Sequence, residues 1–291
     1  MICRDTARSQ HLNTDRRTLF QVFKYAIYAL LTFNIYLFFS TEYLAAQLQF
    51  PGGIAIADLI EAYAATIDTF AWVVLLLMFE LETCVLEDRH FTPTVSWTLH
   101  GTRAMAYAFI VYAFYGYLAN LFATYLASPL PGVSDLCTLA SGQWSYAVSL
   151  DDYVGIAAAN CATLSDSAVF FQYDGISAVV DGSGLRDIQY LAWVDVINAG
   201  VWLGIVMVLE IEVWLQEHKR FEGLIFRIIN QLKYLMYATL LLAAVYWGFE
   251  GDFVDFWDAL LWLVAFFFIE LNVVEWRNEV IDEHEKLLQG Q

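Results

Sequence analysis

Carboxylate side chains recur inside long apolar segments of this 291-residue chain. A pattern of one Trp, seven apolar residues and one Glu occurs three times, at 72–80, 202–210 and 262–270. Its members are Trp72, Trp202 and Trp262 with Glu80, Glu210 and Glu270. An ionisable group inside an apolar segment is costly and is by default a candidate for function. Internal repetition also indicates that the chain is built from copies of one unit.

A second polar layer lies four residues before each Trp, at Asp68, Asn198 and Asp258. At 100° per residue, Asp68 lies about 40° from Glu82 but about 120° from Glu80 on a helix surface. If the Asp68 layer faces an axis, the axial set is Asp68, Asn198, Asp258, Glu82, Glu212 and Asn272, flanked by Trp72, Trp202 and Trp262. Two polar rings separated by an apolar constriction are typical of a cation path. The alternative is a packed core, in which these side chains bond to Tyr, Trp or backbone groups and the tryptophans pack helices together.

Basic residues begin the helices that precede each repeat. They are Lys24, Arg103 and Lys233, and we expect them to form ion pairs within each hairpin, with Glu80, Glu210 and Glu270 respectively. A charge placed in a low-dielectric site requires such a partner. The alternative is that the three glutamates form a ring lining a cation route.

The composition of the chain indicates which structural elements position these groups. The chain is 59% hydrophobic, more than a soluble domain usually is. Several apolar runs reach the roughly 18 residues needed to cross a membrane. We expect six spans near 24–40, 60–83, 104–126, 188–213, 228–249 and 253–274. The predicted fold is an all-α integral membrane protein, with three parallel-repeat helical hairpins around a pseudo-threefold axis.

The basic residues also predict the orientation. Of the 14 Lys and Arg, all but Arg186 fall in or beside the two tails and the loops on their side. Both tails, 1–22 and 276–291, are therefore expected in the cytoplasm, and segment 128–187 outside a bacterial inner membrane. Without a linker, we expect a single membrane domain over 1–291.

The segment 128–187 is expected to form a small cap. It contains seven Asp and one Arg, together with Cys137 and Cys161. A Cys137–Cys161 disulfide fits an oxidising compartment, whereas two free buried thiols are the alternative. Short apolar runs at 168–171 and 176–180, separated by an Asp-Gly pair, indicate some strand structure.

Several function classes are disfavoured. The net charge of −18 argues against nucleic acid as a partner. Acidic residues beside His at 87–90, 216–218 and 282–284 are unequally spaced, so we expect no metal site. No motif of an enzyme or a cofactor site is present, and we expect neither catalysis nor a cofactor.

Two functions remain for a chain of this kind. The first is a channel or transporter for protons, sodium or a divalent cation that uses the intramembrane carboxylates. The second is a non-transporting structural or assembly subunit of a membrane complex. In both, the partners are membrane lipid and further subunits, either copies of this chain or other proteins.

Overall fold

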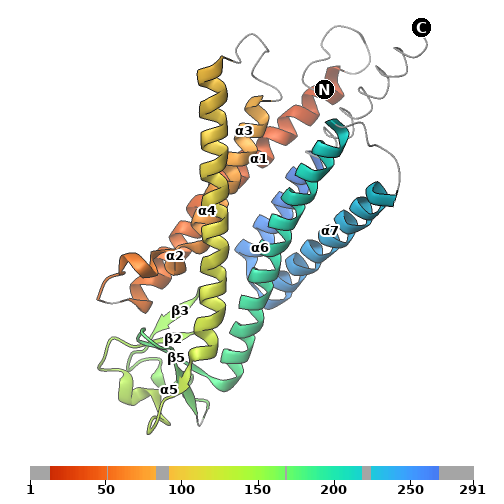
Figure 1. Cartoon of the computed structure of the whole chain (residues 1–291). Helices are drawn as coiled ribbons and strands as arrows, with labels where there is room; N and C mark the ends of the chain where they lie inside the picture. Colours follow the sequence, from red (N-terminus) through yellow and green to blue (C-terminus); the bar gives the residue numbers. More distant parts are fainter. Residues whose placement is uncertain (1–13, 51, 83–91, 168, 218–223, 269–291) are drawn as a thin grey trace, which may run out of the picture. The chain divides into compact units, whose positions relative to one another are not determined.

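A computed structural model describes residues 14–50, 52–82, 92–167, 169–217 and 224–268 (Figure 1). The described chain is mostly helical. Four of its helices are long and apolar enough to cross a membrane, at Thr18–Gln49, Pro93–Leu126, Gly182–Glu212 and Arg227–Glu250. These helices indicate an integral membrane protein.

The long helices are α1 (Thr14–Gln49), α3 (Ala64–Glu80), α4 (Pro93–Leu126), α6 (Gly182–Glu217) and α7 (Leu224–Glu250). A last helix begins at 253 and is described to 268. Within the described residues, α3 and the last helix are shorter than the four candidate spans. Four of the six expected spans therefore coincide with helices that are long and apolar enough to cross a membrane.

Local caps help two of these helices, α4 and α6, to begin earlier than the apolar runs predicted. Before α4, the Thr92 hydroxyl accepts a hydrogen bond from the Val95 amide, and Pro93 occupies the first helical position. Before α6, Asp181 Oδ1 accepts the Gly184 amide at 2.6 Å. Burial raises the pKa of Asp181, but its hydrogen bonds outweigh burial and hold the pKa below the ordinary value.

The predicted span at 60–83 is interrupted near its start. A short turn, η1 (Ile56–Asp58), leads into α2 (Leu59–Ala62), and Tyr63 leaves helical geometry with φ −135° and ψ 33° before α3 begins. Gly116 of α4 lets this segment approach closely. A Cβ atom at Gly116 would lie 2.9 Å from the carbonyl oxygen of Ile60.

A five-stranded sheet forms the core of the cap. Its strands are β1 (Ser128–Pro129), β2 (Ser145–Ala147), β3 (Tyr153–Gly155), β4 (Phe170–Gln172) and β5 (Ala178–Asp181). The order is β1-β4-β5-β2-β3; β2 and β5 are parallel and the other pairs antiparallel. The strands predicted on either side of the Asp-Gly pair are confirmed as β4 and β5, with Gly175 at φ +79° between them. The all-α class is therefore wrong for the cap.

Strand β5 is buried on both of its faces. Val179 packs with Leu136 and Phe170 on one side, while Ala178 and Val180 pack in a second cluster. All three β5 side chains have no exposed surface. A strand buried on both faces reads as a continuous apolar run, as 178–180 does.

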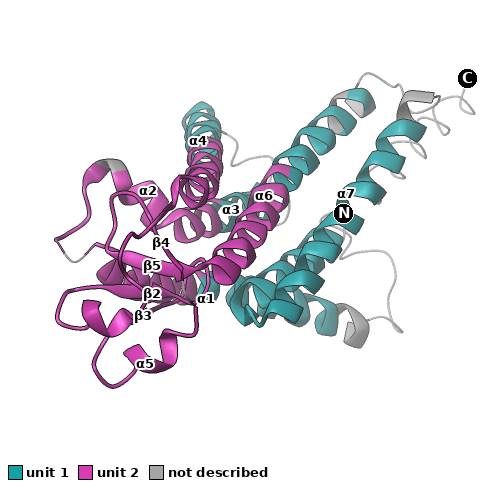
Figure 2. Ribbon diagram, turned by 90° about the horizontal axis from the view of Figure 1, so that it is seen from below, with its two compact units in different colours: residues 1–34, 72–106, 201–291 teal, residues 35–71, 107–200 magenta. Residues whose placement is uncertain are grey.

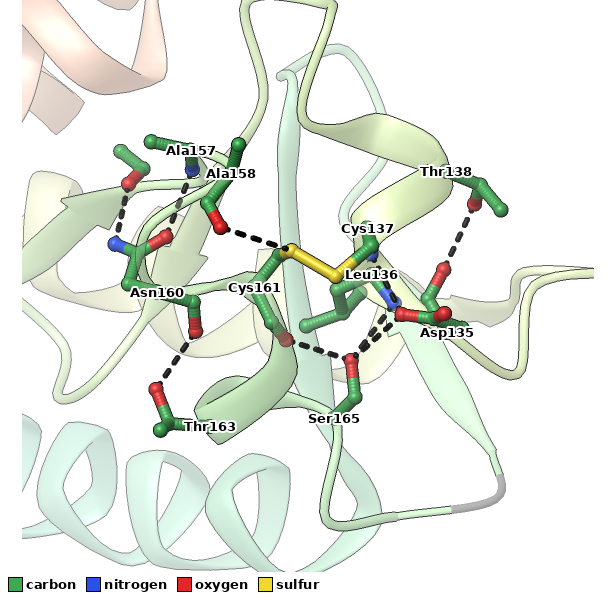
Figure 3. The surroundings of a disulfide bond; sticks show 11 residues. Asp135, Leu136, Cys137, Thr138, Ala157, Ala158, Asn160, Cys161, Thr163 and Ser165 are labelled. Atoms are coloured by element: carbon green, nitrogen blue, oxygen red, sulfur yellow. Dashed lines mark hydrogen bonds between the residues drawn. A yellow bond between two sulfur atoms is a disulfide. The ribbon is translucent and has the colours of Figure 1, made fainter.

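The Cys137–Cys161 disulfide is present and joins two short helices of the cap, η4 (Leu136–Leu139) and α5 (Cys161–Leu164) (Figure 3). Hydrogen bonds tie the same two turns together. The Ser165 hydroxyl donates to the Cys161 carbonyl at 2.7 Å and accepts the Leu136 amide at 2.8 Å. Asp135 accepts the Cys137 amide at 2.8 Å. The disulfide thus reinforces a junction that is already hydrogen-bonded.

The chain forms two compact units (Figure 2). Unit 1 comprises 1–34, 72–106 and 201–291, and unit 2 comprises 35–71 and 107–200, including the cap. Each boundary falls inside a helix: α1, α3, α4 or α6.

Replacing Cys137 and Cys161 together by Ser should destabilise the cap selectively. The bridge closes a loop with a sequence separation of 24, for which chain entropy predicts a loss of about 3 kcal/mol. Hydrogen exchange of the cap amides measures this loss, with the exposed Thr163→Ala variant as the control. Unchanged protection in the double variant would show that the bridge adds nothing to cap stability.

Candidate functional site

Lys24 and Glu80 form a buried ion pair between α1 and α3 in unit 1. Lys24 Nζ lies 2.6 Å from Glu80 Oε1, and the two side chains are 4% and 7% exposed. The Tyr25 hydroxyl donates to the same oxygen at 2.9 Å, and Lys24 Nζ lies 4.9 Å from the centroid of the Tyr25 ring. This is the pair expected for the first hairpin. Glu80 Oε2 is buried and has no hydrogen-bond partner within the described chain.

Unit 1 contains two further ion pairs. Each joins a carboxylate near the end of one helix to a basic residue of the helix that follows it in the chain. Lys233 Nζ lies 2.7 Å from Glu212 Oε2, and Arg103 pairs with Glu82. In each of these two pairs, the two partners are 21 residues apart in the sequence. That equal spacing is the sequence signal for these pairs.

These contacts were not expected from helical phase. Glu82 and Glu212 were predicted to face an ion pathway, and each is ion-paired. The predicted pairings of Arg103 with Glu210 and of Lys233 with Glu270 stay predictions. Helical phase within one helix does not reveal which neighbouring helix supplies a cation. Glu270 and Asn272 lie outside the described residues.

The three repeated tryptophans come together in unit 1. Ring centroids lie 6.1 Å apart for Trp72 and Trp202, 6.2 Å for Trp72 and Trp262, and 6.4 Å for Trp202 and Trp262. Phe266 joins the cluster, with its centroid 4.5 Å from that of Trp202. Each tryptophan is at most 7% exposed. Tilted and edge-on aromatic pairs of this kind contribute about 0.5–1.5 kcal/mol each beyond the area they bury.

Asp258, one member of the second polar layer, is held by a residue that the sequence analysis missed. Asn34 of α1 donates its amide to Asp258 Oδ1 at 2.7 Å, also within unit 1. Asn34 has no exposed surface, and its Oδ1 atom has no hydrogen-bond partner in the part of the chain described. A lone Asn in the apolar run 27–39 was the available signal.

The other two members of that layer, Asp68 and Asn198, belong to unit 2. The Tyr117 hydroxyl lies 3.5 Å from Asp68 Oδ2, a long contact for a hydrogen bond. The Asn198 Oδ1 atom is buried and lacks a hydrogen-bond partner among the described residues. Of these two side chains, Asn198 therefore keeps a buried acceptor oxygen without a partner among the described residues.

Glu42 of α1 is a second residue that the sequence analysis missed, and its carboxylate is buried. It is 7% exposed and caps the amino end of α3, directly after the interruption at Tyr63. Its carboxylate accepts the Ala65 amide at 2.8 Å, the Thr66 amide at 3.1 Å and the Thr66 hydroxyl. A helix amino end favours a negative charge, and this one receives it from another helix.

Comparison with known proteins provides no family for this chain. No protein-family model matches it, and no curated protein or solved structure does. Functional inference is therefore based on the contacts of its own residues.

Removing one partner of the buried Lys24–Glu80 pair should lower the free energy of unfolding more than removing both partners. Lys24→Ala leaves Glu80 as an uncompensated buried charge, and a loss of about 3–5 kcal/mol in unfolding free energy is expected. Adding Glu80→Ala should restore part of that loss. Unfolding in mixed micelles measures both variants.

The control is Arg103→Ala, since Arg103 and Glu82 are 35% and 24% exposed. Its expected cost is about 1 kcal/mol or less. A Lys24→Ala, Glu80→Ala double variant as unstable as the sum of its singles would show that the two groups are not coupled.

Proposed function

We propose that this chain moves small cations (protons, sodium or a divalent ion) across a membrane, using carboxylate and amide oxygens inside its helices. The proposed layout has six spans: the four candidate helices, a span at 60–83 and a span at 253–274. The part of the last span beyond 268 lies outside the described residues. Both termini are cytoplasmic in a bacterial inner membrane, and the cap at 128–187 is outside.

The observation that carries the proposal is a set of buried acceptor oxygens without donors. Within the described residues these include Asn34 Oδ1, Glu80 Oε2 and Asn198 Oδ1. Leaving a buried acceptor unsatisfied costs about 1–3 kcal/mol, so each such atom in a native protein requires an explanation. A cation or a water molecule passing these oxygens supplies the missing partner. Two of the three carry no formal charge, which suits transient binding.

The packing of the tryptophans supports the pseudo-threefold part of the proposal. Trp72, Trp202 and Trp262 occupy one position of the repeat, and their three mutual centroid distances span only 6.1–6.4 Å. Equivalent residues of three repeats meet in this way when they surround a common axis. Because the rings are in contact, passage along such an axis requires them to separate. We therefore favour a transporter or a gated channel over an open pore.

The second candidate is a structural or assembly subunit. It is favoured by the buried ion pairs, in which the charges of Lys24 and Lys233 are compensated by Glu80 and Glu212 inside the protein. A subunit of this kind would expose its apolar helices and its acidic cap to lipid and to partner subunits, either copies of this chain or other proteins. It would carry no cation.

Flux through proteoliposomes separates the two candidates. The purified wild-type chain should dissipate a proton, sodium or divalent-cation gradient, and the Asp68→Asn, Asp258→Asn double variant should lose that flux because two intramembrane charges are removed. Dyes enclosed in the vesicles report each ion. Size-exclusion chromatography verifies that the variant is folded.

The matched control is Asp166→Asn, which removes an exposed carboxylate of the cap and should leave flux unchanged. If the wild type carries none of these cations, the transport proposal fails and the structural role stands. Undiminished flux in the double variant would exclude these two carboxylates from the pathway.

A further inference from the structure

A small pocket lies in unit 2, where the ends of α1, α2 and α4 meet the cap. Its volume is about 60 Å³. Four carboxylate side chains line it: Glu42, Glu61, Asp151 and Asp174. None of the described residues that line it is Lys or Arg. An acidic lining that contains no Lys or Arg favours a cationic occupant.

Tyr173 provides an independent sign that the pocket accepts a ligand. It lines the pocket and is only 5% exposed, yet its hydroxyl has no hydrogen-bond partner in the described chain. Burial, together with nearby Tyr146, raises the pKa of this hydroxyl above its ordinary value, so the group stays neutral. A neutral hydroxyl has acceptor lone pairs as well as a proton to donate. A bound donor group would satisfy the oxygen that the protein leaves without a partner.

The surrounding charge strengthens the attraction for a cation. Unit 2 carries twelve Asp and Glu residues in its sequence against one basic residue, Arg186 (magenta in Figure 2). An uncompensated charge of one sign raises the local concentration of oppositely charged ligands. The pocket therefore lies in strongly acidic surroundings, as is expected of a cation site.

The chemistry of the lining narrows the class of cation. Within the described residues, no group of three His, Cys, Asp or Glu side chains is placed to hold a metal ion. The aromatic rings of Phe50, Tyr153 and Tyr173 also line the pocket, and such rings attract ammonium ions. A volume of about 60 Å³ admits a small head group and excludes a bulky one. N–H donors of an ammonium group match both the Tyr173 oxygen and the carboxylates.

We propose that this pocket binds a small ammonium ion with N–H donors, either ammonium itself or the protonated primary amine of a small molecule. The Tyr173 hydroxyl accepts one N–H bond, while Glu61 and Asp174 supply countercharge. Glu42 is already bonded to the amino end of α3 and is not needed as a ligand. This site is independent of the proposed transport, because it requires only equilibrium binding.

Calorimetric titration of the purified full chain in detergent, at constant ionic strength, tests the assignment. Methylammonium should bind saturably with one site per chain, whereas tetramethylammonium, which is larger and has no N–H donor, should not. Tyr173→Phe removes a neutral hydrogen-bond partner and should weaken binding about 3- to 10-fold. Glu61→Gln removes a charge and should weaken it about 10- to 100-fold.

Matched controls are Tyr190→Phe and Asp166→Asn, which alter exposed residues of unit 2 and should bind as the wild type does. If Tyr173→Phe does not fold, the Glu61→Gln variant decides alone. The proposal is overturned if methylammonium does not bind, if sodium or magnesium binds more tightly, or if tetramethylammonium binds equally well. Wild-type affinity in both pocket variants would overturn it too. A chain without cation flux would still bind methylammonium, so the two proposals fail separately.

Discussion

Compensation of buried charge is the constraint on which the helices of unit 1 depend. Lys24 and Lys233 lie within long apolar helices, where an unpaired ammonium group is strongly unfavourable. Each therefore fixes a carboxylate of another helix at hydrogen-bonding distance, Glu80 in one case and Glu212 in the other. Such pairs add little net stability compared with apolar contacts, but they select one register between helices, because any slip leaves a buried charge alone.

The same register brings the aromatic side chains into contact. With the ion pairs formed toward one end of α3 and α6, Trp72 and Trp202 of these helices meet Trp262 in a single cluster. Beyond the cluster, Asn34 and Asp258 hold each other within the helices. Unit 1 thus has three successive layers along its repeat: compensated charges, packed indoles, and a polar pair with an unsatisfied oxygen.

In unit 2, buried charge is compensated in a different way. It has almost no basic residues, so its buried carboxylate Glu42 is neutralised by the amino end of a helix instead of by a cation. Three further acidic residues of unit 2, Glu61, Asp151 and Asp174, line the pocket beside the cap. The sheet and the turns between its strands carry the cap residues of that pocket.

Membrane character, the Cys137–Cys161 bridge and the two cap strands were predictable, because apolar length, compartment chemistry and Asp-Gly turns are local properties of the sequence. The break at Tyr63 was not predicted, since it depends on Glu42 of another helix to accept the amides that the break leaves free. Nor did helical phase reveal that Glu82 and Glu212 are ion-paired. Apolar, charged and repeated positions can be read directly from the order of the residues. Which charges are compensated becomes visible only in the fold, because the partner of a charge lies on a segment far away in the chain that folding brings close.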